Sequence, residues 1–144
     1  MFADLIRRLT QASPETLPDA DARIAIGAVL VRLARSDGDY SPVEIARIDA
    51  ILATRYGLSD PAPLRAQCEA LEAEAPDTVR FTRAIKDAVP YDERVGVIEA
   101  LWQVVLADGR RSDEENALLR LVASLLGVTD TDSHMARQRV ARDS

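Results

Sequence analysis

Residues 30–52 read LVRLARSDGDYSPVEIARIDAIL, and residues 101–123 read LWQVVLADGRRSDEENALLRLVA. Each stretch consists of an apolar run at helical spacing, an Asp-Gly pair, and a second apolar run at helical spacing. We interpret the two stretches as copies of one helix-turn-helix unit. An offset of 71 residues aligns the polar positions of this unit: Asp37 with Asp108, Ser41 with Ser112, and Glu44 with Glu115.

The polar residues of the first copy each have a local structural role. Gly38 can adopt the left-handed conformation that ends a helix, because glycine has no Cβ to clash. Ser41 and Glu44 have the spacing of a capping box, in which each side chain accepts a hydrogen bond from the other residue's amide. Pro42 would occupy the first helical position, where no amide donor is needed. The second copy has the same Gly, Ser and Glu, so both units are predicted to be antiparallel helix pairs.

Length and composition point to a soluble globular protein. The chain has 144 residues, the size of one domain with a single core. Its hydrophobic content is 47% and its charged content is 29%. A net charge of -6 disfavours nucleic acid as a partner, because nucleic acid requires a basic surface. We find no apolar run long enough to cross a membrane and no secretory signal, so we expect a cytoplasmic protein without direct membrane insertion.

The predicted fold is all-α, because no useful stretch alternates apolar and polar residues. We expect a compact bundle of about seven to eight helices in a single domain over residues 1–144, with the helix that precedes Asp37 at its centre. Ser59 is predicted to cap the helix after the first unit, and one of residues 130–133 to cap the last helix. The expected divisions are an N-terminal helix and linker (1–18), the first unit (about 20–58), a connecting helix pair (60–89), the second unit (about 91–128) and a polar C-terminal helix (130–144).

Residues that commonly carry catalysis are sparse in this chain. His134 is the single histidine and is expected at the surface, whereas Cys68 is the single cysteine and is expected in the core. Trp102 lies on an apolar helical stripe and is predicted to be a core residue. We find no Ser-His-acid triad, structural zinc set, phosphate-binding loop or dinucleotide fingerprint. The sequence therefore predicts a protein that is not an enzyme.

Carboxylates at the two turns are the remaining candidates for a site. Asp37 and Asp108 each follow a helix, whose dipole disfavours a negative charge at that end by about 0.3–1 kcal/mol. If the two units pack about a twofold axis, both aspartates would converge with Glu44 and Glu115, and such a cluster requires a cation or raised pKa values. Oxygen ligands favour Ca²⁺, Mg²⁺ or Mn²⁺ over Zn²⁺. The same residues are equally explained as turn formers and helix caps.

Three features occur in a fixed order along the chain. The motif Ser/Ala-Asp-Gly-x-x-Ser-x-x-Glu occurs twice, each copy is followed by an apolar helix that ends in Gly-Leu-Ser-Asp or Gly-Val-Thr-Asp, and residues 81–109 read FTRAIKDAVPYDERVGVIEALWQVVLADG. This combination, over about residues 20–140, resembles the tellurite-resistance TerB family. The resemblance implies a compact all-α cytosolic domain in which acidic residues bind a divalent metal. The implied ligands are Asp37, Glu44, Asp108 and Glu115, with Asp39 as an optional addition.

The resemblance also implies a role in tellurite resistance or stress, since related domains occur in such operons and in membrane-anchored J-domain co-chaperones. Our first hypothesis is a non-enzymatic module in which a divalent cation bridges the two turns and alters a face that binds an unidentified protein partner, including a membrane-associated one. The second is a metal-independent structural interaction domain. In that case the turn acids would be neutralised by arginines, for which the candidates are Arg23, Arg94, Arg110 and Arg111. A metal-assisted hydrolase that uses the same carboxylates is a third alternative.

Overall fold

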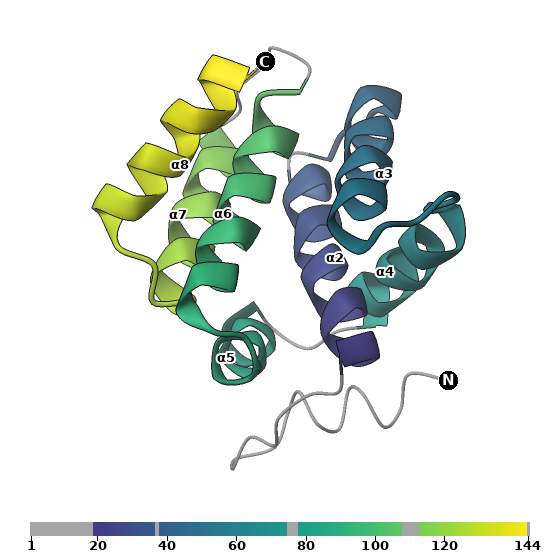
Figure 1. The fold of residues 1–144 in the computed structure, drawn as a ribbon, viewed down its shortest axis with the longest axis horizontal. Helices are drawn as coiled ribbons and strands as arrows, with labels where there is room; N and C mark the ends of the chain where they lie inside the picture. Colours follow the sequence, from purple (N-terminus) through teal and green to yellow (C-terminus); the bar gives the residue numbers. More distant parts are fainter. Residues whose placement is uncertain (1–18, 37, 75–77, 108–112, 144) are drawn as a thin grey trace.

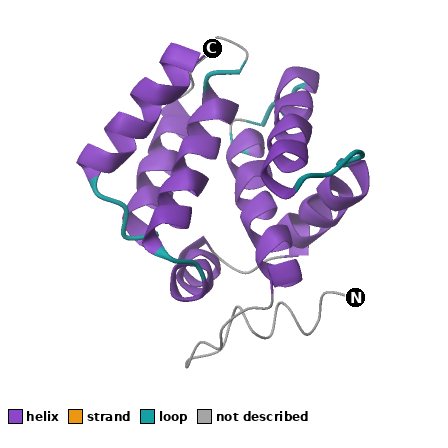
Figure 2. Ribbon diagram, viewed as in Figure 1, coloured by secondary structure: helices purple, strands orange, loops and turns teal. Residues whose placement is uncertain are grey.

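The computed structural model describes residues 19–36, 38–74, 78–107 and 113–143. Within these ranges the chain forms seven α-helices and no strand, which confirms the all-α prediction (Figure 1, Figure 2). The helix predicted within residues 1–18 lies outside this part of the chain. No helix in the described ranges is long and apolar enough to span a membrane. The helices are α2 (Asp19–Arg35), α3 (Pro42–Tyr56), α4 (Ala62–Glu74), α5 (Thr78–Ala88), α6 (Tyr91–Val105), α7 (Asp113–Leu125) and α8 (Asp130–Asp143).

The central helix of the bundle is α2, as its nearly continuous apolar sequence predicts. Every residue from 25 to 31 is buried, and α2 contacts α3, α4, α5, α6 and α7. Its contact with α4 is extensive, and Cys68 and Leu71 of α4 are fully buried there. The prediction that the single cysteine is a core residue is therefore confirmed.

The predicted helix pairs are α2 with α3, and α6 with α7. The second helix of each pair ends at a glycine with positive φ, Gly57 at 64° and Gly127 at 71°. After Gly57, the amide of Leu58 donates to the carbonyl of Ala53 over 2.9 Å, and an equivalent bond follows Gly127. These bonds form the Schellman arrangement, which requires a left-handed residue. Both pairs therefore end in the same way.

Contacts between the two pairs are reciprocal. The first helix of each pair contacts both helices of the other pair: α2 contacts α6 and α7, and α6 contacts α2 and α3. Two related units packed about a twofold axis would produce this pattern. Duplication of one ancestral unit stays a prediction.

Two helix caps differ from the sequence prediction. The Asp60 carboxylate, not the Ser59 hydroxyl, accepts a hydrogen bond from the Ala62 amide at the start of α4, over 3.2 Å. At the start of α8, the hydroxyl of Thr129 accepts from the amide of Asp132 over 3.1 Å, one residue before the predicted range. Short polar side chains can bond amides two or three residues ahead, so several neighbouring residues compete to cap one helix.

The last helix, α8, packs along α6 (Figure 1). Although its sequence is mostly polar, it buries Ser133, Ala136 and Val140. Trp102 of α6 is partly buried against the core, and its indole Nε1–H donates to the Ser133 hydroxyl over 3.3 Å. The tryptophan thus packs against the core without being fully buried, and it also connects α6 to α8.

Candidate functional site

Glu44 lies in the first turn of α3 and is almost completely buried, with 2% of its surface exposed. The amide and the hydroxyl of Ser41 both donate to its Oε1 over 3.2 Å, and its own amide donates to the Ser41 hydroxyl oxygen over 3.2 Å. The predicted capping box is confirmed, with Pro42 at the start of the helix. This arrangement places a buried carboxylate at the positive end of the α3 dipole.

Glu115 occupies the matching position in the second helix pair. It lies in the first turn of α7 with 4% of its surface exposed, whereas its neighbours Asp113 and Glu114 are exposed. Carboxylates are rarely buried without hydrogen bonds or a compensating charge. The starts of α3 and α7 lie at the same end of the bundle (Figure 1). Each buried glutamate follows an Asp-Gly pair by the same number of residues.

The aspartates of the predicted metal site are described only in part. Asp39 is exposed at the first turn. Among the residues that the structure describes, no three or more His, Cys, Asp or Glu side chains are grouped so as to hold a metal ion. Convergence of the predicted ligands stays a prediction. The predicted site residues outside the described ranges are Asp37, Asp108, Arg110 and Arg111, together with Ser112 of the second capping box.

Arg23 and Arg94 contact groups at the C-terminal ends of the partner helices. Neutralisation of the turn acids by arginines stays a prediction, because Asp37, Asp108, Arg110 and Arg111 lie outside the described residues. The guanidinium carbon of Arg23 lies 4.7 Å from the centroid of the Tyr56 ring, at the C-terminal end of α3. Arg94 donates from Nη1 to the carbonyl of Leu126 over 2.5 Å, just after α7. Each arginine lies near the start of its own helix, α2 or α6, whereas the turn follows the end of that helix. Their positive charges favour the C-terminal ends of the partner helices.

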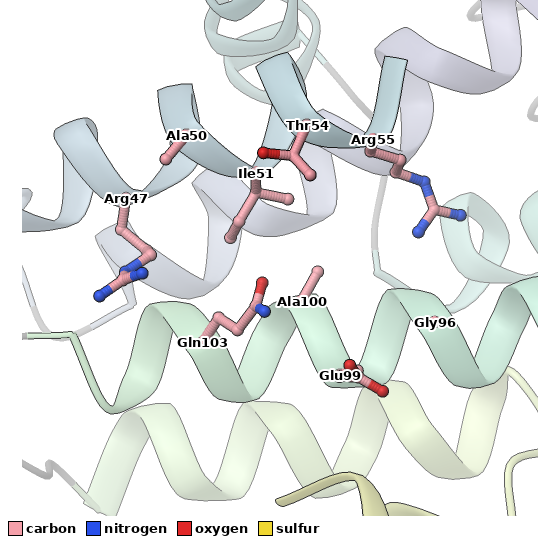
Figure 3. A pocket seen from close by; sticks show the side chains of 9 residues that line it. All are labelled: Arg47, Ala50, Ile51, Thr54, Arg55, Gly96, Glu99, Ala100 and Gln103. Carbon is pink, nitrogen blue, oxygen red and sulfur yellow. The ribbon is translucent and has the colours of Figure 1, made fainter. Parts of the chain in front are cut away.

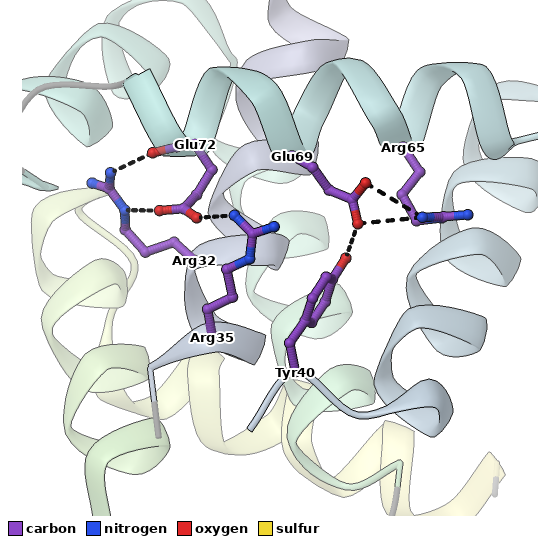
Figure 4. Close-up of polar contacts among 6 residues, drawn as sticks. All are labelled: Arg32, Arg35, Tyr40, Arg65, Glu69 and Glu72. Atoms are coloured by element: carbon purple, nitrogen blue, oxygen red, sulfur yellow. Dashed lines mark hydrogen bonds and ion pairs between the residues drawn. The ribbon is translucent and has the colours of Figure 1, made fainter. Parts of the chain in front are cut away.

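The arginines of the last turn of α2, Arg32 and Arg35, pair with α4 (Figure 4). Glu72 of α4 accepts from Nε of Arg32 over 3.4 Å and from Nη1 of Arg35 over 2.7 Å. Arg32 also donates from Nη2 to the main-chain carbonyl of Glu72 over 3.2 Å, and Arg35 lies 4.9 Å from the centroid of the Tyr40 ring. The last turn of α2 is therefore positively charged, which its dipole favours, and a carboxylate from another helix balances that charge.

Tyr40 connects the first turn to α4 (Figure 4). Its hydroxyl donates to Oε2 of Glu69 over 2.7 Å, and Arg65 contacts the same oxygen over 3.2 Å. Arg65 also donates from Nε to Asp49 of α3 over 2.7 Å. Burial and the bond to Glu69 raise the pKa of Tyr40, and the bond to Asp49 raises the pKa of Arg65. The hydroxyl thus keeps its proton and the guanidinium its charge, so the network holds the turn against α3 and α4.

The sequence matches a known family. The sequence profile of the family described as "Tellurite resistance protein TerB" matches residues 23–138. The chain belongs to the TerB family. The resemblance noted in the sequence is thereby confirmed.

The fold of this TerB domain is also similar to a solved structure. A crystal structure of a protein of unknown function from Porphyromonas gingivalis W83 matches with a TM-score of 0.63 and 19% sequence identity. The match covers 92% of this chain and 96% of that one. At this identity the likeness shows the fold alone. No curated protein matches the chain in sequence.

Sequence spacing did not reveal the polar network of the TerB domain. Arg65 and Glu69 are four residues apart, which is a recognisable helical ion pair. The other contacts join distant segments: Arg32 and Glu72, for example, are separated by 40 residues. Such pairs depend on how α2 packs against α4, and no local pattern predicts that.

Histidine and cysteine side chains often act in catalysis, and this chain has one of each, His134 and Cys68. His134 is exposed on α8, as predicted, and its Nε2 lies 3.2 Å from Nε2 of Gln138. Cys68 is fully buried, and burial raises the pKa of its thiol to about 12. At neutral pH the thiol is therefore protonated and inaccessible, which is opposite to the surroundings of a reactive cysteine.

Cavities in the described part of the TerB domain lie between helices. One cavity of about 360 Å³ lies between α3 and α6, with an arginine of α3 at each end (Figure 3). Another of about 520 Å³ is bordered by Trp102, Asn116, Ser133 and His134, from α6, α7 and α8. Neither cavity is lined by Glu44 or Glu115.

Proposed function

We propose that this TerB domain is a non-enzymatic module that binds a divalent cation at its Asp-Gly turns and transmits the bound state to a protein partner, in tellurite resistance or a related stress response. The observation that carries the proposal is the burial of Glu44 and Glu115, which are 2% and 4% exposed. These glutamates have matching positions in the two helix pairs, each after an Asp-Gly pair. Each helix pair thus holds a buried carboxylate beside its turn, and a carboxylate in such a position can serve as a ligand to a cation.

The ligand chemistry favours a hard cation. Carboxylate oxygens from Asp37, Asp39 and Asp108 would join those of Glu44 and Glu115, and oxygen-only sets suit Ca²⁺, Mg²⁺ or Mn²⁺ better than Zn²⁺. A cation would also relieve the unfavourable position of Asp37 and Asp108 after a helix. Since the turns connect the helices of each pair, a cation held by both turns would fix the angle between the pairs. The partner would then recognise that angle.

A metal-independent interaction domain is the second candidate, and the capping box favours it. Ser41 already donates two hydrogen bonds to the Glu44 carboxylate, which stabilises the charge without a cation. Arg32 and Arg35 also place positive charge in the last turn of α2, just before the first Asp-Gly pair. In this case the acids serve the fold alone.

Thermal unfolding of metal-stripped protein distinguishes the two candidates. We expect Ca²⁺, Mg²⁺ or Mn²⁺ to stabilise the native state by about 2.7 kcal/mol at 100 times the dissociation constant, which raises Tm by several degrees. The variant Glu44→Gln/Glu115→Gln keeps the size and the acceptor oxygen of each side chain but removes both charges. The matched control is Glu114→Gln, which removes a charge from an exposed neighbour in the same helical turn.

The outcomes are distinct. Stabilisation of the wild type and of Glu114→Gln, but not of Glu44→Gln/Glu115→Gln, supports cation binding at the buried glutamates. Equal stabilisation of all three proteins would assign the cation to another surface. If no cation shifts Tm at millimolar concentration, the metal-independent candidate is correct.

A further inference from the structure

The groove between α3 and α6 has a volume of about 360 Å³ and is lined by both apolar and polar residues (Figure 3). Ala50 and Ile51 line it from α3, and Ala100 lines it from α6. Gly96 leaves the α6 backbone uncovered at one end, where a Cβ would lie only 3.3 Å from Nη1 of Arg55. The amide of Gln103 points into the space between the two helices. The groove can thus accept an aliphatic side chain and bond a polar group.

Two arginines of α3, Arg47 and Arg55, lie at the two ends of this groove (Figure 3). Neither forms an ion pair with any residue that the structure describes, and the guanidinium carbon of Arg55 lies 5.8 Å from the centroid of the Tyr56 ring. The carboxylate in the lining, Glu99, is already paired with Arg139 of α8 over 3.2 Å. The groove therefore carries two positive charges that its own lining does not neutralise, although the net charge of the chain is -6.

We propose that this groove binds an acidic, extended segment of a partner protein. Arginine binds carboxylates through paired, charge-assisted hydrogen bonds, so a guanidinium at each end selects a segment with two acids. The apolar wall between the arginines selects an aliphatic side chain between those acids. The inference rests on the proposed function in assuming a protein partner, but it requires no cation. Nucleic acid is disfavoured, because its binding depends on a broadly basic surface.

The separation of the arginines determines the spacing of the acids. Arg55 follows Arg47 by eight residues, which corresponds to about 12 Å along a helix that rises about 1.5 Å per residue. An extended segment rises about 3.3 Å per residue, and its residues i and i+4 point to the same side about 13 Å apart. The matching segment therefore has acids four residues apart, with an aliphatic residue midway between them on the same side.

A peptide of this design tests the proposal. The probe is the heptapeptide Gly-Glu-Ser-Leu-Ser-Glu-Gly, titrated into ¹⁵N-labelled full-length protein while amide chemical shifts are recorded by NMR. We expect shift changes at groove residues, including Ala50, Thr54 and Gly96. Replacing both glutamates of the peptide by glutamine should weaken binding at least tenfold. Absence of shift changes with the acidic peptide would overturn the proposal.

Variants of the protein test the charge and the shape of the groove separately. Arg47→Gln/Arg55→Gln should weaken peptide binding at least tenfold, whereas the control Arg83→Gln/Arg120→Gln removes two exposed arginines of α5 and α7 and should leave binding unchanged. Ala50→Phe, at an exposed position, fills the groove without changing charge and should also weaken binding tenfold. If Arg55→Gln impairs folding, Arg47→Gln and Ala50→Phe still provide the test.

Reversal of the charges gives the strictest control. The variant Arg47→Glu/Arg55→Glu should no longer bind the acidic peptide. It should bind instead a peptide in which lysine replaces both glutamates. Equal effects of the groove and control variants, or tighter binding of a 12-nucleotide RNA than of the peptide, would overturn the proposal. Stabilisation by a divalent cation should be unchanged in Arg47→Gln, so failure of the groove proposal is distinguishable from failure of the cation proposal.

Discussion

Gly27 of α2 lies directly against the thiol of Cys68 of α4. A Cβ at residue 27 would overlap the sulfur and lie 3.2 Å from the Cβ of Cys68. Both residues are buried in the contact between the two helices. A glycine is therefore required where α2 and α4 approach, and the sulfur fills the space that the absent side chain leaves.

Substitution Gly27→Ala should lower the free energy of unfolding by about 1–3 kcal/mol, because a methyl group cannot enter this packed contact without displacing the sulfur. The loss should occur even though alanine favours a helix by about 1 kcal/mol over glycine. Urea unfolding measures it. In a Cys68→Ala background the sulfur is absent, so the same substitution should cost much less. Equal costs in both backgrounds would contradict the contact.

The buried thiol also predicts a dependence of stability on pH. Burial raises the pKa of Cys68 from 9.0 to about 12, so between these values the unfolded chain loses a proton that the folded chain keeps. The unfolded state then binds fewer protons, and the free energy of unfolding falls as pH rises above about 9. Burial also raises the pKa values of Tyr40 and Tyr56, which extends the loss above about pH 10.

Cys68→Ala isolates the contribution of the thiol. Urea unfolding between about pH 8.5 and 10 should show a smaller loss of stability for this variant than for the wild type. At neutral pH, a thiol reagent should modify the wild type only after unfolding. Rapid modification of the folded protein, or identical pH profiles for both proteins, would contradict burial of a protonated thiol.

The hydrogen bond from Tyr40 to Glu69 provides a prediction about the first turn. Tyr40→Phe removes the donor and should lower the free energy of unfolding by about 1 kcal/mol. A double-mutant cycle with Glu69→Ala should assign most of this loss to the pair, since in that background Tyr40→Phe removes no such bond. Additive effects of the two substitutions would show that the bond does not stabilise the fold.

Local features of the fold were predictable from the sequence, and long-range polar contacts were not. The capping box of Ser41 and Glu44 was predicted correctly because both groups lie within one helical turn. Burial of Cys68 followed from its apolar stripe. The contact of Arg23 with the Tyr56 ring was not predicted, because charge alone does not specify which residue of a neighbouring helix an arginine meets. The pairing of Glu72 with Arg32 and Arg35 depends on the packing of α4 against α2, which spacing alone does not specify.

Gly57 ends α3 with a φ of 64°, in the left-handed region. A Cβ added to this residue would have no neighbouring atom within 4 Å. Other residues are therefore disfavoured there by the backbone conformation and not by a steric clash with neighbouring atoms. Gly57→Ala should lower the free energy of unfolding by about 1 kcal/mol. Gly57→Asn should cost less, because asparagine tolerates the left-handed conformation. Chemical denaturation of the three proteins compares them. An alanine variant as stable as the wild type would contradict the strained geometry.

Equilibrium dialysis tests cation binding at the turns most directly. Metal-stripped wild type, Glu44→Gln/Glu115→Gln and the control Glu114→Gln would be dialysed against Ca²⁺, Mg²⁺ or Mn²⁺, and the ions bound per chain counted by elemental analysis. We predict about one ion per chain for the wild type and the control, because one cation bridges both turns, and loss of this ion in Glu44→Gln/Glu115→Gln. No bound ion in the wild type, or the same number in all three proteins, would contradict the proposal.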